Sequence, residues 1–207
     1  MKAPNKPALD SSRERGRPRE FDIETALDGA VLYFRAHGYG SVSIADLSGA
    51  LKLSAGSIYK AFHNKHTLFV AALDRYVGQR SAKLAEITND AETGREKLYR
   101  FLAFYAESSH AVEGRYGCLV IVSAAELAST DEAIAAKVAA AFKDNERRLK
   151  DIILQGQKDG SISKEIDGPT TAKLMSALVQ GMRVLGKSGQ QRDDVMALVD
   201  VAMKLLD

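Results

Sequence analysis

The stretch from Ser43 to Phe62 constrains the fold of this chain more than any other segment. It reads as two short helices joined by a turn of about three or four residues, with Ser48 as the small side chain where the two backbones could approach. Two helices that cross steeply need both features. The positions expected to be buried are Ile44, Leu47, Leu51, Leu53, Ile58 and Phe62. The pattern predicts a helix-turn-helix that reads DNA.

The rest of the chain repeats its apolar residues every three or four positions, the period of a helix that is buried on one side. Alternating β-branched runs, typical of strands, are scarce. We therefore expect an all-α fold of about nine helices, with a three-helix head and a larger helical body. The longest apolar run, residues 118–122, is far shorter than the roughly 20 residues of a membrane span. Because the first ten residues also lack the apolar stretch of a signal peptide, we expect a cytoplasmic location.

Capping residues place the helices of the head. Asp22 can cap a first helix that ends near Gly38, and Ser54 can cap the third helix. The apolar face of the first helix is expected at Ile23, Ala26, Leu27, Ala30, Val31 and Phe34. The first four helices are expected at residues 22–38, 44–51, 55–62 and about 65–88, and the fourth links head and body.

Similar signals delimit the helices of the body. Thr93 with Glu96, and Ser129 with Glu132, have the spacing of capping boxes for the fifth and seventh helices. Pro169 suits the first turn of the eighth helix, where a missing N–H costs nothing. The last two helices present Leu174, Met175, Leu178, Val179, Met182 and Leu185, and Val195, Leu198, Val199, Ala202 and Leu205. The apolar residues of these two helices cover more of the helix surface than the single narrow stripe that packs on one core. This indicates burial beyond the chain's own core.

Residues 1–20 are polar, rich in proline and basic, and are expected to form a flexible N-terminal arm. Arg17 and Arg19 lie in its basic cluster and can follow phosphates or enter a minor groove, although a solubilising tail would have the same composition. Residues 1–66 carry ten Lys/Arg against seven Asp/Glu, a net charge of +3. The positive excess therefore lies beside the helix-turn-helix.

The second helix of the motif has an unusual outward face: Ala55, Gly56, Ser57, Tyr59 and Lys60. Small residues allow a helix backbone to lie deep in the major groove, and Tyr59 and Lys60 can reach phosphates or base edges. Gly56 costs about 1 kcal/mol of helix propensity relative to alanine. A solvent-facing helix has no need of such residues, so the pattern favours DNA recognition.

Residues 16–76 resemble the DNA-binding head of the TetR/AcrR family of transcriptional repressors, through GRPREFD at residue 16, SIADL at residue 43 and GSIYKAF at residue 56. The resemblance implies a homodimer on a palindromic operator, with a body that dimerises and binds a small inducer. It carries over as DNA contacts Ser43, Ala55, Gly56, Ser57, Tyr59, Lys60 and Lys65. Lys52 departs from the pattern, since glycine is common at this turn and a left-handed lysine is strained.

We therefore expect a ligand-responsive repressor in which residues 21–66 bind DNA and residues 67–207 dimerise and bind the ligand. The inducer should change the tilt of the fourth helix and so release the operator. A ligand-independent or activating DNA-binding regulator remains an alternative.

A second alternative is a redox or electrophile sensor acting through Cys118, the single cysteine. Gly114 and Gly117 bracket a break before the sixth helix, which would place Cys118 at a helix N-terminus near Arg115. Both surroundings lower the pKa of a thiol and make it reactive. A cysteine within an apolar run is also ordinary buried packing.

The resemblance places an inducer cavity in the body, lined by Phe101, Phe104, Tyr105, Cys118, Ile121, Glu126, Phe142, Met175, Val179 and Met182. Each of these could equally be plain core. Aromatic and methionine side chains suit an adaptable apolar pocket, and no dense cluster of charge is evident in these helices. We therefore expect a neutral organic effector, with Glu126 and His110 as the polar groups near it.

Enzyme classes find little support. Ser57 and Lys60 match an S-x-x-K pattern, but its companion motifs are missing and the serine lies on the recognition helix. The four histidines show no metal-ligand spacing, so no metal site and no cofactor are expected, although a metal effector stays open.

Overall fold

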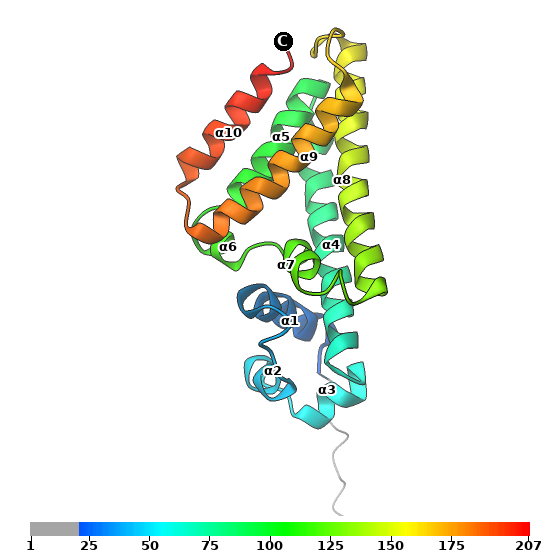
Figure 1. Ribbon diagram of the computed structural model, residues 1–207, viewed down its shortest axis with the longest axis vertical. Helices are drawn as coiled ribbons and strands as arrows, with labels where there is room; N and C mark the ends of the chain where they lie inside the picture. Colours follow the sequence, from blue (N-terminus) through cyan, green and yellow to red (C-terminus); the bar gives the residue numbers. More distant parts are fainter. Residues whose placement is uncertain (1–20) are drawn as a thin grey trace, which may run out of the picture.

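The computed structural model describes residues 21–207, which form ten α-helices, one short 3-10 helix and no strand (Figure 1). The predicted arm, with Arg17 and Arg19, lies outside the described residues. The helices are α1 (Ile23–His37), α2 (Ile44–Leu51), α3 (Ala55–Phe62), α4 (Lys65–Asn89), α5 (Gly94–Glu107), α6 (Ala111–Tyr116), α7 (Leu119–Glu126), α8 (Glu132–Asp159), α9 (Gly168–Leu185), η1 (Gly186–Ser188) and α10 (Arg192–Lys204).

The helices form two parts along the long axis (Figure 1). The head, α1 to α3, lies at one end; the body, α5 to α10, lies at the other; and α4 runs from one into the other. The expected domain boundary at residue 66 falls within the first turn of α4, so no loop separates the two parts at that point. None of the helices in residues 21–207 is long and apolar enough to span a membrane.

Nine helices correspond to those expected, and α6 occupies the segment expected to be a break. Asp22 caps α1 by accepting the N–H of Glu24, as predicted. The cap of α8 differs from the prediction: Asp131, rather than Ser129, accepts the N–H of Ile134. At α5, Thr93 accepts as predicted, but the Glu96 carboxylate accepts the N–H of Glu92, so the capping box is not reciprocal.

Two apolar clusters fill the interior. The first joins α1 to α4 with α7 and the start of α8, and includes Phe34, Leu47 and Phe69. The second lies within the body between α5, α8, α9 and α10. Four of the residues expected on apolar faces are exposed in the single chain: Ile23, Leu174, Leu185 and Leu205. Ile23 is in the first turn of α1, whereas the other three belong to the surface of α9 and α10 that is described below.

The turn of the helix-turn-helix forms as the sequence predicts. Ser48 lies between the helices, and its hydroxyl donates to the Leu53 carbonyl at 2.5 Å. Lys52 adopts the left-handed conformation, with φ 54° and ψ 38°. Because its side chain is exposed, this backbone strain has no visible compensation from side-chain packing.

The head joins the body through a buried arginine of α1. The Arg35 side chain is 4% exposed, and its Nε donates to the Gly117 carbonyl at 2.9 Å. Its Nη2 lies 2.6 Å from the Glu113 carboxylate. Its guanidinium also lies over the rings of Tyr76 and Tyr116. A charge removed from water must be paired in this way, so Arg35 fixes α1 against α6 and the loop before α7.

A second connection between head and body involves the loop after α1. Gly38 ends α1 with φ 76°, a conformation that favours glycine, and a Cβ there would lie 2.2 Å from the Glu126 carboxylate. That carboxylate accepts the N–H groups of Tyr39 at 2.7 Å and Gly40 at 3.0 Å. The end of α7 is therefore held directly on the head.

Replacing Lys52 with glycine is expected to stabilise the protein. Glycine removes the steric cost of the left-handed conformation, and after its extra backbone entropy in the unfolded state the net gain should be about 0.5–1 kcal/mol. Urea denaturation measures it. Lys60→Gly, within α3, is the matched control and should lose about 1 kcal/mol. A destabilised Lys52→Gly would contradict the account of the turn.

Replacing Arg35 with methionine should lower the free energy of unfolding by about 3 kcal/mol, because it leaves a buried carbonyl and the Glu113 carboxylate with fewer partners. Arg75→Met is the control. Arg75, which is itself 18% exposed, joins α4 to the exposed carboxylates of Glu24 and Asp28 on α1, and ion pairs with exposed partners contribute about 1 kcal/mol or less. Equal losses in the two variants, measured by denaturation, would rule out a special role for Arg35.

Candidate DNA interface and effector cavity

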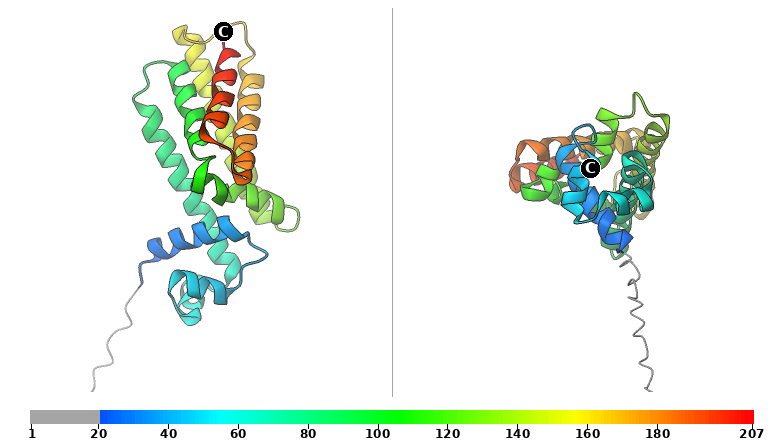
Figure 2. Two further views of the ribbon diagram at one scale, coloured as in Figure 1. Left: turned by 90° about the vertical axis from the view of Figure 1, so that its left-hand side faces the viewer. Right: turned by 90° about the horizontal axis from the view of Figure 1, so that it is seen from below.

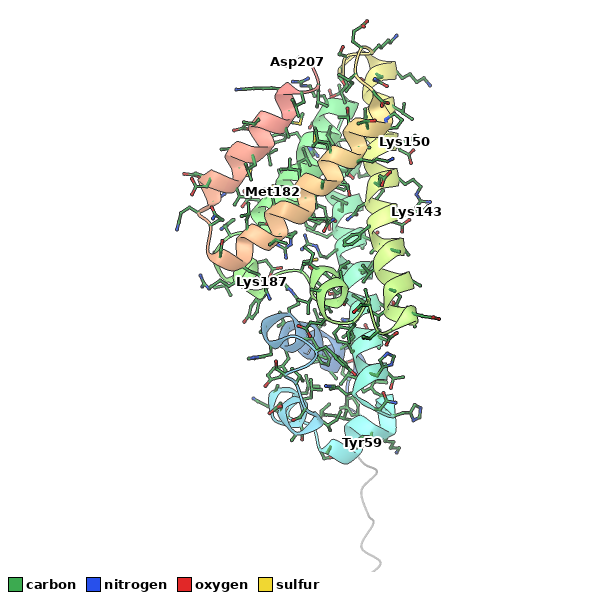
Figure 3. The ribbon with its side chains drawn as sticks, in the orientation of Figure 1. Tyr59, Lys143, Lys150, Met182, Lys187 and Asp207 are labelled. Carbon is green, nitrogen blue, oxygen red and sulfur yellow. The ribbon has the colours of Figure 1, made fainter. Side chains whose placement is uncertain are left out.

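Helix α3 lies at the end of the molecule opposite the C-terminus. Figure 3 shows Tyr59 at this end and Asp207 at the other. Ile58 and Phe62 are buried against the head, whereas Gly56, Tyr59 and Lys60 are exposed, Tyr59 by 50%. The residues predicted to face DNA are therefore on the outer side of α3, with Ala55 and Ser57 partly covered.

Hydroxyl groups cap both helices of the motif. Ser54 accepts the N–H of Ser57 at 3.0 Å at the start of α3. Ser43 and Asp46 form a capping box at the start of α2, with Ser43 exposed. The Ser43 hydroxyl donates to the Asp46 carboxylate at 2.6 Å, and these hydrogen bonds lower the pKa of Asp46. Because a phosphate oxygen only accepts hydrogen bonds, a phosphate contact by Ser43 would require its hydroxyl to turn away from Asp46 and donate to the phosphate instead.

Lys65 is used inside the head. Its Nζ donates to the carbonyls of Tyr39 at 3.0 Å and Val42 at 2.8 Å, and lies 4.1 Å from the centre of the Tyr39 ring. The ammonium group has three donors in all. Lys65 therefore braces the loop between α1 and α2 and has one N–H left for a phosphate, a role that the resemblance did not indicate.

The body contains a cavity between α4, α5, α8 and α9, next to the start of α7. It encloses about 60 Å³. Its walls are Tyr76, Val77, Arg80, Ser81, Leu84, Tyr105, Cys118, Val120, Ala141, Phe142, Asp144, Asn145, Arg148, Gln180 and Arg183. The cavity lies where the two apolar clusters meet, beside the loop that holds Arg35.

Three of the ten predicted lining residues are in its wall: Tyr105, Cys118 and Phe142. The others belong elsewhere. Phe101, Met175, Val179 and Met182 are packed in the second cluster, Phe104 packs at its edge and Ile121 packs against the first. Glu126 binds the head, and His110 lies 3.0 Å from the Glu107 carboxylate. Helical periodicity identified the interior but could not distinguish a solid core from the wall of a cavity.

The wall of the cavity also carries charges that were not assigned to it from the sequence. Three arginines line it, against one aspartate, and one of them, Arg80, comes from α4. Buried atoms that have no hydrogen-bond partner among the described residues are the Tyr76 hydroxyl, Arg80 Nε and Arg183 Nε. All three belong to the wall. Burial raises the pKa of Tyr76 and of Tyr105, so both phenols keep their protons and can donate.

Sequence reasoning missed the arginines, although one signal was present. Arg183 lies four residues after Val179, on the same side of the eighth predicted helix as its buried apolar residues. An arginine on an apolar face indicates either a buried ion pair or a ligand.

The predicted surroundings of Cys118 can also be compared with the structure. Cys118 is 8% exposed and is the residue directly before α7. Arg115, which was expected near the thiol, has an exposed side chain.

No group of three or more potential metal-binding His, Cys, Asp or Glu side chains occurs in the part of the chain that the structure describes.

Comparisons with known proteins agree with this architecture. The family described as "Bacterial regulatory proteins, tetR family" matches residues 26–72, and "Tetracyclin repressor-like, C-terminal domain" matches residues 94–199. The HTH-type transcriptional repressor ComR of Escherichia coli (strain K12) is 30% identical over 194 residues, which cover 93% of this chain and 92% of ComR. BdcR, another HTH-type transcriptional repressor of that strain, is 36% identical over 110 residues, 53% of this chain and 56% of BdcR.

A solved structure is similar over the whole described fold. It is a cysteine mutant of the TetR family transcriptional regulator CifR, complexed with 26bp double-strand operator DNA. It has a TM-score of 0.83 and 28% identity, and the match covers 93% of this chain and 100% of that one. The family matches in head and body, and the similarity to ComR along nearly its full length, show that this chain belongs to the TetR family of DNA-binding transcriptional regulators.

Proposed function

We propose that this protein is a repressor that binds a palindromic operator as a dimer and releases it when a small molecule enters the body cavity. The observation that carries the proposal is the outer face of α3, where Gly56, Tyr59 and Lys60 are exposed at one end of the molecule. ComR and BdcR are named as repressors, and CifR was solved on operator DNA, which supports this function.

We assign the DNA contacts to residues 21–66, and dimerisation and ligand binding to residues 67–207. In the head, the small residues Ala55, Gly56 and Ser57 would allow α3 to enter the major groove, with Tyr59 and Lys60 on phosphates or base edges. Ser43 and the remaining N–H of Lys65 would contact the backbone of the DNA, as would Arg17 and Arg19 from the arm.

The dimer surface is proposed on α9 and α10, which lie together on one face of the body (Figure 2). Large apolar residues are exposed there, namely Leu174, Val184 and Leu185 on α9, Val201 on α10, and Leu205 directly after α10. Ala177 and Gly181 add small exposed positions between those of α9. Exposed apolar residues at helical spacing along two adjacent helices are typical of an interface with a second copy of the same chain.

The effector would bind in the cavity at the centre of the body, because that cavity adjoins the connection between Arg35 and Gly117. A redox role for Cys118 remains the alternative: its place in the cavity wall suits contact with a small molecule that enters. An unchanged effector response in Cys118→Ser would exclude that role.

Lys60→Gln should weaken operator binding and reduce its dependence on salt concentration, because each subunit of the dimer loses one phosphate contact. The slope of log affinity against log salt should fall in magnitude by about two units for the dimer. Gel-shift titrations at several salt concentrations, using DNA from upstream of the protein's own gene, measure both quantities. Lys83→Gln, on an exposed part of α4 away from α3, is the control. Equal effects of the two substitutions would count against α3 as the recognition helix.

Val201→Asp should convert the dimer to a monomer and reduce operator affinity, because a desolvated carboxylate at an apolar interface is strongly unfavourable. Analytical ultracentrifugation gives the mass. Leu32→Asp introduces the same charge at an exposed leucine of α1 and should leave the protein dimeric. A dimeric Val201→Asp variant would refute the proposed surface.

A further inference from the structure

The cavity of the body has an excess of positive charge. Arg80, Arg148 and Arg183 line it, and guanidinium groups stay charged at every physiological pH. The one carboxylate in its wall, Asp144, is exposed and pairs with Arg147 at 2.9 Å. Glu113 lies outside the wall, close to Arg35 at 2.6 Å and at the limit of an ion pair with Arg80 at 4.0 Å. The charges within the wall are therefore not balanced by the protein.

Arg183 shows this imbalance most clearly. It is 1% exposed, and no carboxylate lies within 4.0 Å of it among residues 21–207. Its Nη2 donates to the Gly117 carbonyl at 2.8 Å and its Nη1 to the Ser109 hydroxyl at 3.4 Å, while its Nε has no partner in the described part of the chain. A buried charge without an opposite charge is unfavourable unless a ligand supplies one.

Two further donors accompany it. Arg80 donates through Nη2 to the Ser108 hydroxyl at 3.1 Å, but its buried Nε has no partner in residues 21–207, nor does the hydroxyl of Tyr76. Tyr76 itself is 4% exposed. Arg80 lies over the rings of Phe104 at 4.3 Å and Tyr105 at 5.1 Å, which limits its movement. The three residues that carry these unpartnered donors, two on α4 and one on α9, thus line the same small space.

We propose that this space is the binding site of an organic carboxylate, held by Arg80, Arg183 and Tyr76. A carboxylate offers the acceptor oxygens that unpaired guanidinium and phenol donors need, and it neutralises the surplus charge. The cavity of about 60 Å³ is less than half of the roughly 150 Å³ that binds benzene in a well-studied engineered cavity. A carboxylate of two to four carbons fits this size. The assignment rests on the proposed effector cavity and names its ligand class.

The same arginine connects the site to the head. The Gly117 carbonyl accepts from Arg183 at 2.8 Å and from Arg35 at 2.9 Å, so one oxygen joins α9 to α1. A carboxylate that draws the Arg183 guanidinium toward the cavity weakens its bond to Gly117. The Gly117 carbonyl, which accepts the hydrogen bond of Arg35, is then no longer held in place by Arg183. Helix α1 can therefore shift relative to the body. Carboxylate binding is thereby linked to operator release.

Propanoate and propanamide are the probes, since they have nearly the same size and differ in charge. Binding is measured by calorimetry and by the shift in melting temperature, both at constant ionic strength set with sodium chloride. Propanoate should bind and raise the melting temperature with increasing concentration, and propanamide should not. In gel shifts, propanoate should release operator DNA. Equal binding of propanamide, or the same shift with added chloride alone, would overturn the carboxylate assignment.

Arg80→Gln and Tyr76→Phe should weaken propanoate binding about tenfold and several-fold respectively, since each removes one donor. Lys83→Gln, which removes the same charge three residues further along α4 at the surface, should have no effect. Undiminished binding in both cavity variants would refute the site. Propanoate binding that depends on Arg80 but leaves the operator complex intact would support the site and contradict the proposed effector function, which separates the two hypotheses.

Discussion

The carbonyl of Gly117 is the contact on which the relation between head and body depends. It accepts hydrogen bonds from Arg35 of α1 and Arg183 of α9, two guanidinium groups that are almost fully buried. Neither arginine could be withdrawn from water at this depth without such partners. Because Gly117 has φ 75°, its backbone favours glycine, and a Cβ there would also lie 2.5 Å from the Lys187 side chain. One short segment between α6 and α7 therefore binds both buried arginines at this junction.

Much of the fold could be predicted from local patterns. Residues that cap helices, such as Asp22 and Ser54, act through neighbours within three positions, so the sequence contains the whole interaction. The left-handed Lys52 was expected from the family resemblance, because glycine is common at this position of the turn. The cap of α8 was misplaced because Ser129 and Asp131 are both competent, and tertiary contacts select between them: Asp131 also lies 2.6 Å from His66 of α4.

The functional regions were less predictable where they depend on distant residues. The exposed face of α3 follows from helical periodicity alone. In contrast, Lys65 binds carbonyls more than twenty residues earlier in the chain, and Glu126 binds amides in the head. The apolar face of its helix marks Arg183 as buried, but its partners Ser109 and Gly117 are more than sixty residues away and are known only once α9 is placed in the fold. The charge of the cavity could not be seen in the composition of any one segment, because the charged residues on its wall come from three separate helices, α4, α8 and α9.

Helix α9 has two functional sides. Gln180 and Arg183 face the cavity, whereas Gly181 and Val184, the next residues in each case, are exposed on the proposed dimer surface. An α-helix is about 10 Å across with its side chains, so in the proposed dimer the two cavities lie back to back at roughly one helix width from the symmetry axis. A change in the position of α9 in one subunit then alters the surface against which the partner's α9 packs. Such an arrangement gives cooperativity between the two binding sites a direct structural route.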